Sequence, residues 1–109
     1  MATKGKTTNV ERRFGRFVTA LKARYFLGEM KANWKECTIN KISPQGVGVE
    51  FYEDIQVGST IHLMITFPRE PKTIMLKGTL KWIEQSKNVF AGGIEFIEML
   101  DDSTFAKLI

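Results

Sequence analysis

Short segments of alternating apolar and polar residues, each ended by turn residues, constrain the fold of this chain more than any other feature. The clearest is 61–67, where isoleucine, leucine and phenylalanine alternate with His62, Met64 and Thr66. Alternation with a period of two places one set of side chains on the buried face of a β-strand. The proline-bounded stretch 68–71 ends this segment, because proline cannot donate to a strand ladder.

Five further segments predict strands. Residues 17–26 (FVTALKARYF) also fit a helical face through Phe17, Ala20 and Leu21, and we interpret them as a strand because strands follow. In the fifth strand the alternation predicts Leu80 and Trp82 on the core side, with Ile74 and Leu76. The predicted strands are 17–26, 34–43, 47–51, 61–67, 72–84 and 89–99, with turn residues between them.

The C-terminal residues predict a short helix. Asp101, Asp102 and Ser103 provide an N-cap and an acidic first turn, and Phe105, Leu108 and Ile109 form an apolar face. Six short strands and one terminal helix predict a mainly all-β fold, a small six-stranded antiparallel β-barrel with a short C-terminal α-helix.

Length and composition limit the organisation of the chain. With 109 residues, of which 43% are hydrophobic, the chain has material for one modest core. Residues 1–10 are small and polar, so we expect a flexible N-terminal tail before a domain spanning 11–109. One cysteine, no apolar leader and no long apolar stretch predict a cytoplasmic protein without membrane insertion.

The candidates for catalysis and metal binding are few. His62 is the only histidine and lies in the middle of a predicted strand, and no cluster of cysteines or carboxylates with metal-ligand spacing lies near it. Cys37 has no neighbouring base that would lower its pKa, so we interpret it as a small apolar residue of a strand. We therefore predict a protein that is not an enzyme and has neither a metal site nor a cofactor.

Two polar motifs point to a ligand instead. The string ERRFGRF places Arg12, Arg13 and Arg16 ahead of the first predicted strand, and the turn SPQG carries Ser43 and Gly46. Arginine binds phosphate or the O6/N7 edge of guanine through two parallel hydrogen bonds, and it also stacks on a purine. The net charge of +4 permits an anionic partner without requiring one.

Together these motifs resemble the PilZ domain family. Arg12 and Arg16 form an R-x-x-x-R box, and Ser43 with Gly46 forms the S-x-x-G part of a second box. The similarity extends from about residue 11 to the terminal helix, and it also rests on Gly58, Gly78, Trp82 and the GIEF string at 93–96.

The resemblance implies a receptor for the bacterial second messenger cyclic di-GMP. Arg12, Arg13 and Arg16 would close over the ligand, Ser43 would offer its hydroxyl, and Gly46 would permit close approach of the backbone. Binding would order the N-terminal arginine segment and alter contact with a downstream effector protein. The regulated output would be motility, biofilm formation or exopolysaccharide production.

One position departs from the family pattern. The family has Asp or Asn two residues before the serine, where this chain has Lys41, and Asn40 comes one residue too early. Lysine offers no acceptor to a guanine N–H, although it can meet a phosphate. Strand alternation points Asn40 away from the side of Lys41 and Ser43 unless a bulge intervenes.

Two alternatives remain at this point. A degenerate PilZ-like module would act as a protein-interaction adaptor without binding nucleotide. A barrel that binds single-stranded nucleic acid would stack bases on Phe14, Phe17, Tyr25 and Phe26, but these aromatics also suit a core, so we expect no nucleic acid polymer as a partner.

Overall fold

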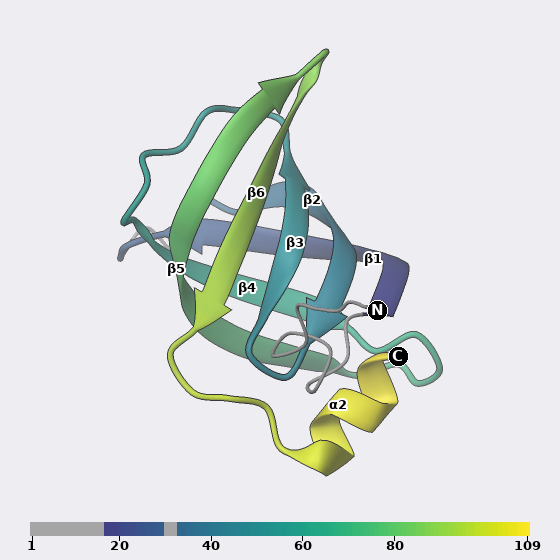
Figure 1. Ribbon diagram of the computed structural model, residues 1–109. Coiled ribbons are helices and arrows are strands. Elements are labelled where there is room, and N and C mark those ends of the chain that lie inside the picture. Colours follow the sequence, from purple (N-terminus) through teal and green to yellow (C-terminus); the bar gives the residue numbers. More distant parts are fainter. Residues whose placement is uncertain (1–16, 30–32) are drawn as a thin grey trace, which may run out of the picture.

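The computed structural model describes residues 17–29 and 33–109. It confirms the expected fold, a closed antiparallel barrel with strand order β1-β2-β3-β6-β5-β4 and a short helix after it (Figure 1). The predicted tail 1–10 lies outside the described residues. The elements are β1 (Phe17–Leu27), β2 (Lys35–Ser43), β3 (Gly46–Phe51), β4 (Thr60–Thr66), β5 (Thr73–Ser86), β6 (Val89–Phe96) and α2 (Asp102–Leu108).

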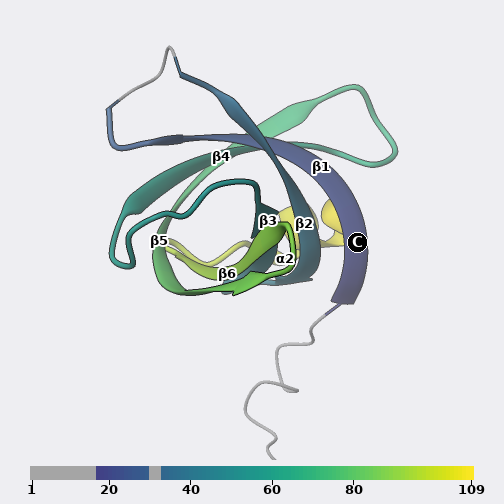
Figure 2. The ribbon, with the colours of Figure 1, turned by 90° about the horizontal axis from the view of Figure 1, so that it is seen from above.

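The barrel interior is filled by the apolar half of each alternating strand. Ile61, Leu63 and Ile65 of β4 are fully buried, which confirms the clearest prediction from the sequence. Burying each such side chain stabilises the fold by roughly 1.5–3 kcal/mol. Seen from above, the six strands form the ring that encloses this core (Figure 2). Other core side chains are Tyr25, Ile39, Val49, Phe51, Leu80 and Leu108.

The outside of the barrel carries a small aromatic cluster. Phe26 lies on the outer side of β1, yet it is buried because Trp34 and His62 cover it. The imidazole of His62 stacks on Phe26 with a centroid distance of 4.4 Å, and Trp34 meets the ring edge to face at 4.8 Å. His62 therefore packs against an aromatic ring, as a structural residue does.

Helix α2 is capped and anchored as its sequence suggests. The Thr104 N–H donates to the carboxylate of Asp101 at 2.7 Å, and this hydrogen bond lowers the pKa of Asp101. Leu108 is buried, and the ring of Phe105 packs against the ring of Phe17 of β1 with a centroid distance of 5.5 Å. Ile109, predicted on the apolar face, is instead the exposed C-cap residue.

A hydrogen-bonded group ties the loop after β3 to β1 and β2. The buried Tyr25 hydroxyl donates to Glu53, and Lys35 donates to both carboxylate oxygens of Glu53 at 2.8 and 2.9 Å. Burial raises the pKa of Glu53, but the hydrogen bonds from Lys35 and Tyr25 outweigh it, so the pKa lies below its usual value. Burial and the neighbouring carboxylate raise the pKa of Tyr25, which keeps its proton for donation.

Replacing Glu53 with Ala should lower the free energy of unfolding by about 1–2 kcal/mol, because the Tyr25 hydroxyl loses its acceptor. Because the pKa of Glu53 is lower in the folded protein than in the unfolded chain, its ionised carboxylate stabilises the fold at pH values above the ordinary carboxyl pKa. This stabilisation is lost as the pH falls through the pKa of the folded state. Denaturant unfolding at neutral and acidic pH measures both effects. Asp54→Ala is the control, and an equal loss in that variant would contradict the prediction.

Candidate functional site

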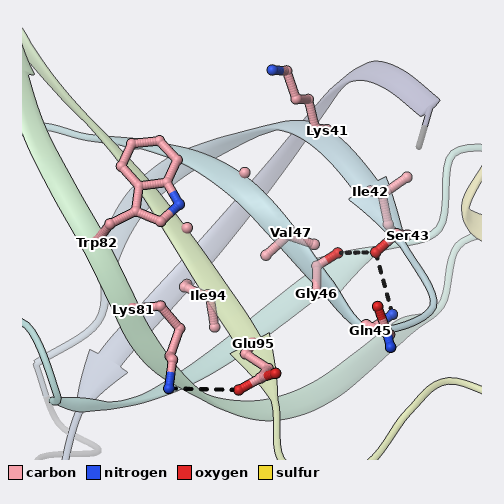
Figure 3. A pocket seen from close by; sticks show the side chains of 12 residues that line it. Lys41, Ile42, Ser43, Gln45, Gly46, Val47, Lys81, Trp82, Ile94 and Glu95 are labelled. Carbon is pink, nitrogen blue, oxygen red and sulfur yellow. Dashed lines mark hydrogen bonds and ion pairs between the residues drawn. The ribbon is translucent and has the colours of Figure 1, made fainter. Parts of the chain in front are cut away.

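An open hollow of about 240 Å³ crosses the outer face of four neighbouring strands (Figure 3). Lys41 and Ser43 of β2 lie on one side of it, and Lys81 and Trp82 of β5 lie on the other. The middle is formed by β3 and β6, which pair in register between them. The central residues of the hollow are Gly46, Val47, Gly48, Gly93, Ile94 and Glu95.

Glycines form the floor of the hollow. Gly48 of β3 lies directly opposite Gly93 of β6, so no side chain rises from either strand at this point. Gly46 approaches the next strand so closely that a methyl group built on it would come within 2.2 Å of the Ile94 carbonyl oxygen. The floor therefore has no side chains of its own, and the space that they would fill is taken by the Trp82 ring at Gly93 and by the Asn40 amide oxygen at Gly48.

Trp82 forms one wall, contrary to the prediction that it faces the core. The β5–β6 register shifts between Leu80 and Trp82, so Lys81 is the extra residue of a β-bulge and Trp82 turns outward. The indole is 50% exposed and lies over Gly93, where an added methyl group would come within 2.1 Å of Nε1. Sequence alternation alone contains no signal for this bulge.

Asn40 is the extra residue of a second bulge. Ile39 pairs with Val49 and Lys41 pairs with Gly48, which leaves Asn40 between the two pairs. A methyl group built on Gly48 would come within 2.8 Å of Asn40 Oδ1 and 3.3 Å of Lys41 Cβ. Asn40 is not a lining residue, but its amide oxygen reaches Gly48, which is part of the floor.

The predicted pair Ser43 and Gly46 lies at the tight turn between β2 and β3. The Ser43 hydroxyl donates to the Gly46 carbonyl at 3.4 Å and accepts the Gln45 N–H at 3.3 Å. Both hydrogen bonds are long, so the hydroxyl supports the turn weakly and keeps capacity for another partner.

Charge in the hollow is mixed. Lys81 pairs with Glu95 at 3.7 Å, and both side chains are more than half exposed. Lys41 projects from the opposite wall (Figure 3). Exposed ion pairs contribute little to stability, so the Lys81–Glu95 pair can open at little cost.

The three predicted arginines, Arg12, Arg13 and Arg16, lie outside the described residues. The described chain begins next to the hollow, because Phe17 pairs with Ile42 and Val18 pairs with Lys41. The first described residue, Phe17, therefore lies at the β2 wall.

Three further features concern catalysis, metal binding and membrane spanning in the described part of the chain. Cys37 is buried, and burial raises the pKa of its thiol to about 12, which makes it unreactive. Residues 17–29 and 33–109 contain no group of His, Cys, Asp or Glu suited to a metal ion. Among these same residues, no helix has the length and apolar character needed to cross a membrane.

The PilZ domain model matches residues 11–109, nearly the whole chain. The chain belongs to the PilZ domain family. No curated protein matches this PilZ domain. The matched range contains both polar motifs, and the structure brings the second of them to the edge of the hollow.

Two solved structures share the fold. The inhibitor of motility MotI (DgrA) from Bacillus subtilis has a TM-score of 0.66 and 19% identity, covering 85% of this chain and 46% of MotI. The PilZ domain of YcgR from Escherichia coli, solved with c-di-GMP, has a TM-score of 0.65 and 12% identity, covering 89% of this chain and 85% of that one. This PilZ domain spans about half the length of MotI.

Replacing Gly93 with Ala should lower the free energy of unfolding by about 1–3 kcal/mol, because the new methyl group collides with the Trp82 ring. In a Trp82→Ala background the same change should cost far less. A double-mutant cycle measured by denaturant unfolding gives the coupling. Equal costs in the two backgrounds would show that Trp82 does not lie on Gly93.

Proposed function

We propose that this PilZ domain is a cyclic di-GMP receptor that signals through its N-terminal arginine segment. The observation that carries the proposal is the position of the start of β1: Val18 pairs with Lys41, so the described chain begins beside the β2 wall of the hollow. Arg12, Arg13 and Arg16 precede this junction and are proposed to close over a ligand seated on the glycine floor. The YcgR PilZ domain, which shares the fold, was solved with c-di-GMP.

The size of the hollow supports a two-part site. A volume of about 240 Å³ is below the roughly 300–1,000 Å³ of pockets that enclose a small molecule. The hollow can therefore hold only part of a cyclic dinucleotide, and other groups must cover the rest. Arginines suit this role because each one can bind a phosphate or a guanine edge through two hydrogen bonds.

The hollow itself offers groups for a base and a phosphate. The Trp82 ring, which packs over Gly93 and is half exposed, provides a stacking surface, and base–aromatic stacking is worth about 1–3 kcal/mol. Lys41 and Lys81 can meet phosphate oxygens. The oxygen of Asn40 is proposed to supply the acceptor that lysine at position 41 cannot, because the bulge directs it toward Gly48.

The proposed output is a changed contact with an effector protein. Ligand binding would order the arginine segment and so create or remove a surface for the partner. PilZ domains are regulatory receptor or adaptor domains. The similarity to an inhibitor of motility favours motility as the regulated process, with biofilm or exopolysaccharide output as related candidates.

A PilZ-like adaptor that does not bind nucleotide is the second candidate. Two observations favour it: position 41 is lysine, and the Lys81–Glu95 ion pair lies within the hollow. The nucleic-acid alternative loses support, because Tyr25 and Phe26 are buried and cannot stack on bases.

Isothermal titration with cyclic di-GMP should give selective binding at about micromolar Kd, with GTP and cyclic di-AMP as controls. Replacing Arg12 and Arg16 with Ala should abolish binding without changing the melting temperature. Arg24→Ala, on the outer side of β1, is the matched control and should bind as the wild type does. Retained affinity in the double variant would reject the arginine site, and no binding by the wild type would favour the adaptor.

Replacing Asn40 with Ala should weaken cyclic di-GMP binding about tenfold, because a guanine N–H loses its acceptor. Asn40→Asp keeps an acceptor and should retain affinity. Thr38→Ala, on the same strand and away from the hollow, serves as the control. The same titration measures all three variants, and unchanged binding by Asn40→Ala would remove Asn40 from the site.

A further inference from the structure

Glu95 is the only carboxylate among the described residues that line the hollow, where the other charged side chains are Lys41 and Lys81. It projects from β6 and meets Lys81 at the end of the hollow away from Lys41 (Figure 3). A negative charge in a site for phosphate weakens binding, because like charges repel. The carboxylate therefore favours ligand binding only where it meets hydrogen-bond donors of the ligand.

The ion pair with Lys81 leaves the Glu95 carboxylate able to accept hydrogen bonds. The N–O distance of the pair is 3.7 Å, which is beyond hydrogen-bond length. The Glu95 side chain is 64% exposed, so the pair is hydrated and opens at little cost. Each partner can then take a different group of a ligand, an anion at Lys81 and a donor at Glu95.

Glu95 projects from the same face of β6 that carries the Trp82 ring. Gly93 and Glu95 are alternate residues of the strand, so both point outward, and they lie about 6.6 Å apart. The indole covers Gly93 with one face, and the ring is half exposed. A base stacked on the open face of the Trp82 ring therefore has Glu95 beside its edge.

Guanine and a carboxylate match in their hydrogen-bonding groups. The Watson–Crick edge of guanine presents two adjacent donors, N1–H and the exocyclic amine, and an ionised carboxylate can accept at both of its oxygens. Adenine presents an acceptor, its N1, at the corresponding position, so a carboxylate rejects it. The side chains of Ser43 and Gln45 each have one acceptor oxygen, so neither can take both guanine donors at once.

We propose that Glu95 selects guanine: its carboxylate accepts the N1–H and the exocyclic amine of a base stacked on Trp82. Lys81, released from the ion pair, then meets a phosphate oxygen. The inference rests on the proposed receptor function and assigns the residue that recognises the base. Cyclic di-GMP has two guanines, so the Asn40 oxygen at Gly48 can serve the other one.

The test compares the Kd of cyclic di-GMP with that of cyclic di-IMP, whose bases keep N1–H but lack the exocyclic amine. Isothermal titration of the full chain should show a preference for cyclic di-GMP of about tenfold or more, which one charge-assisted hydrogen bond supplies. Glu95→Gln keeps the side-chain length but offers a single acceptor oxygen, so this preference should fall about tenfold. The two ligands have equal charge, so the loss of the carboxylate charge cancels in the ratio of the two Kd values.

Two further variants separate recognition of the base from effects of charge. Glu98→Gln removes an exposed carboxylate outside the hollow and should leave both Kd values unchanged. Lys81→Met breaks the ion pair from its other side, so both ligands should bind more weakly while the preference for cyclic di-GMP remains. Equal melting temperatures of the wild type and Glu95→Gln check that the fold is intact.

The outcomes distinguish this inference from the receptor proposal. If the wild type binds neither ligand, both fail. If the wild type binds cyclic di-GMP without a preference over cyclic di-IMP, or if Glu95→Gln keeps the preference, the receptor proposal stands and the role of Glu95 is rejected. An equal loss of preference in Lys81→Met would also reject it, because the ion pair and not the carboxylate would then set the preference.

Discussion

The close pairing of β3 with β6 is the contact on which the rest of the structure depends. These strands are far apart in the sequence, and they close the ring by placing Gly48 opposite Gly93 and Val49 opposite Gly92. A side chain at Gly46 or Gly93 would strike backbone or indole atoms at about 2 Å. The same glycines make room for the Trp82 ring and the Asn40 amide on the outer surface, so barrel closure and the candidate ligand site have one cause.

Two β-bulges turn this surface into a site. Each inserts one residue into a strand and thereby reverses the faces of the residues after it. The bulge at Lys81 moves Trp82 from the predicted core side to the wall of the hollow, and the bulge at Asn40 brings its amide oxygen to Gly48. The core is unaffected, because Leu80 and Ile42 remain buried on either side of these irregularities.

Closure of the barrel leaves two kinds of exposed backbone. Where β3 and β6 meet, the backbone is paired on both edges, and its outer face carries the half-exposed Trp82 ring. Where β6 ends before β5 does, Thr73–Lys77 pairs with β4 alone.

The sequence by itself determined the six strands, the capped helix and the family, because alternation, turn residues and an Asp N-cap act over a few neighbouring positions. It also pointed to Ser43, Gly46 and Lys41, which lie together at the hollow. Only the tertiary structure decided the orientation of Trp82, the approach of Asn40 to the floor and the unpaired edge of β5. Each of these depends on which residue of a distant strand lies opposite, and register between distant strands is set when the barrel closes.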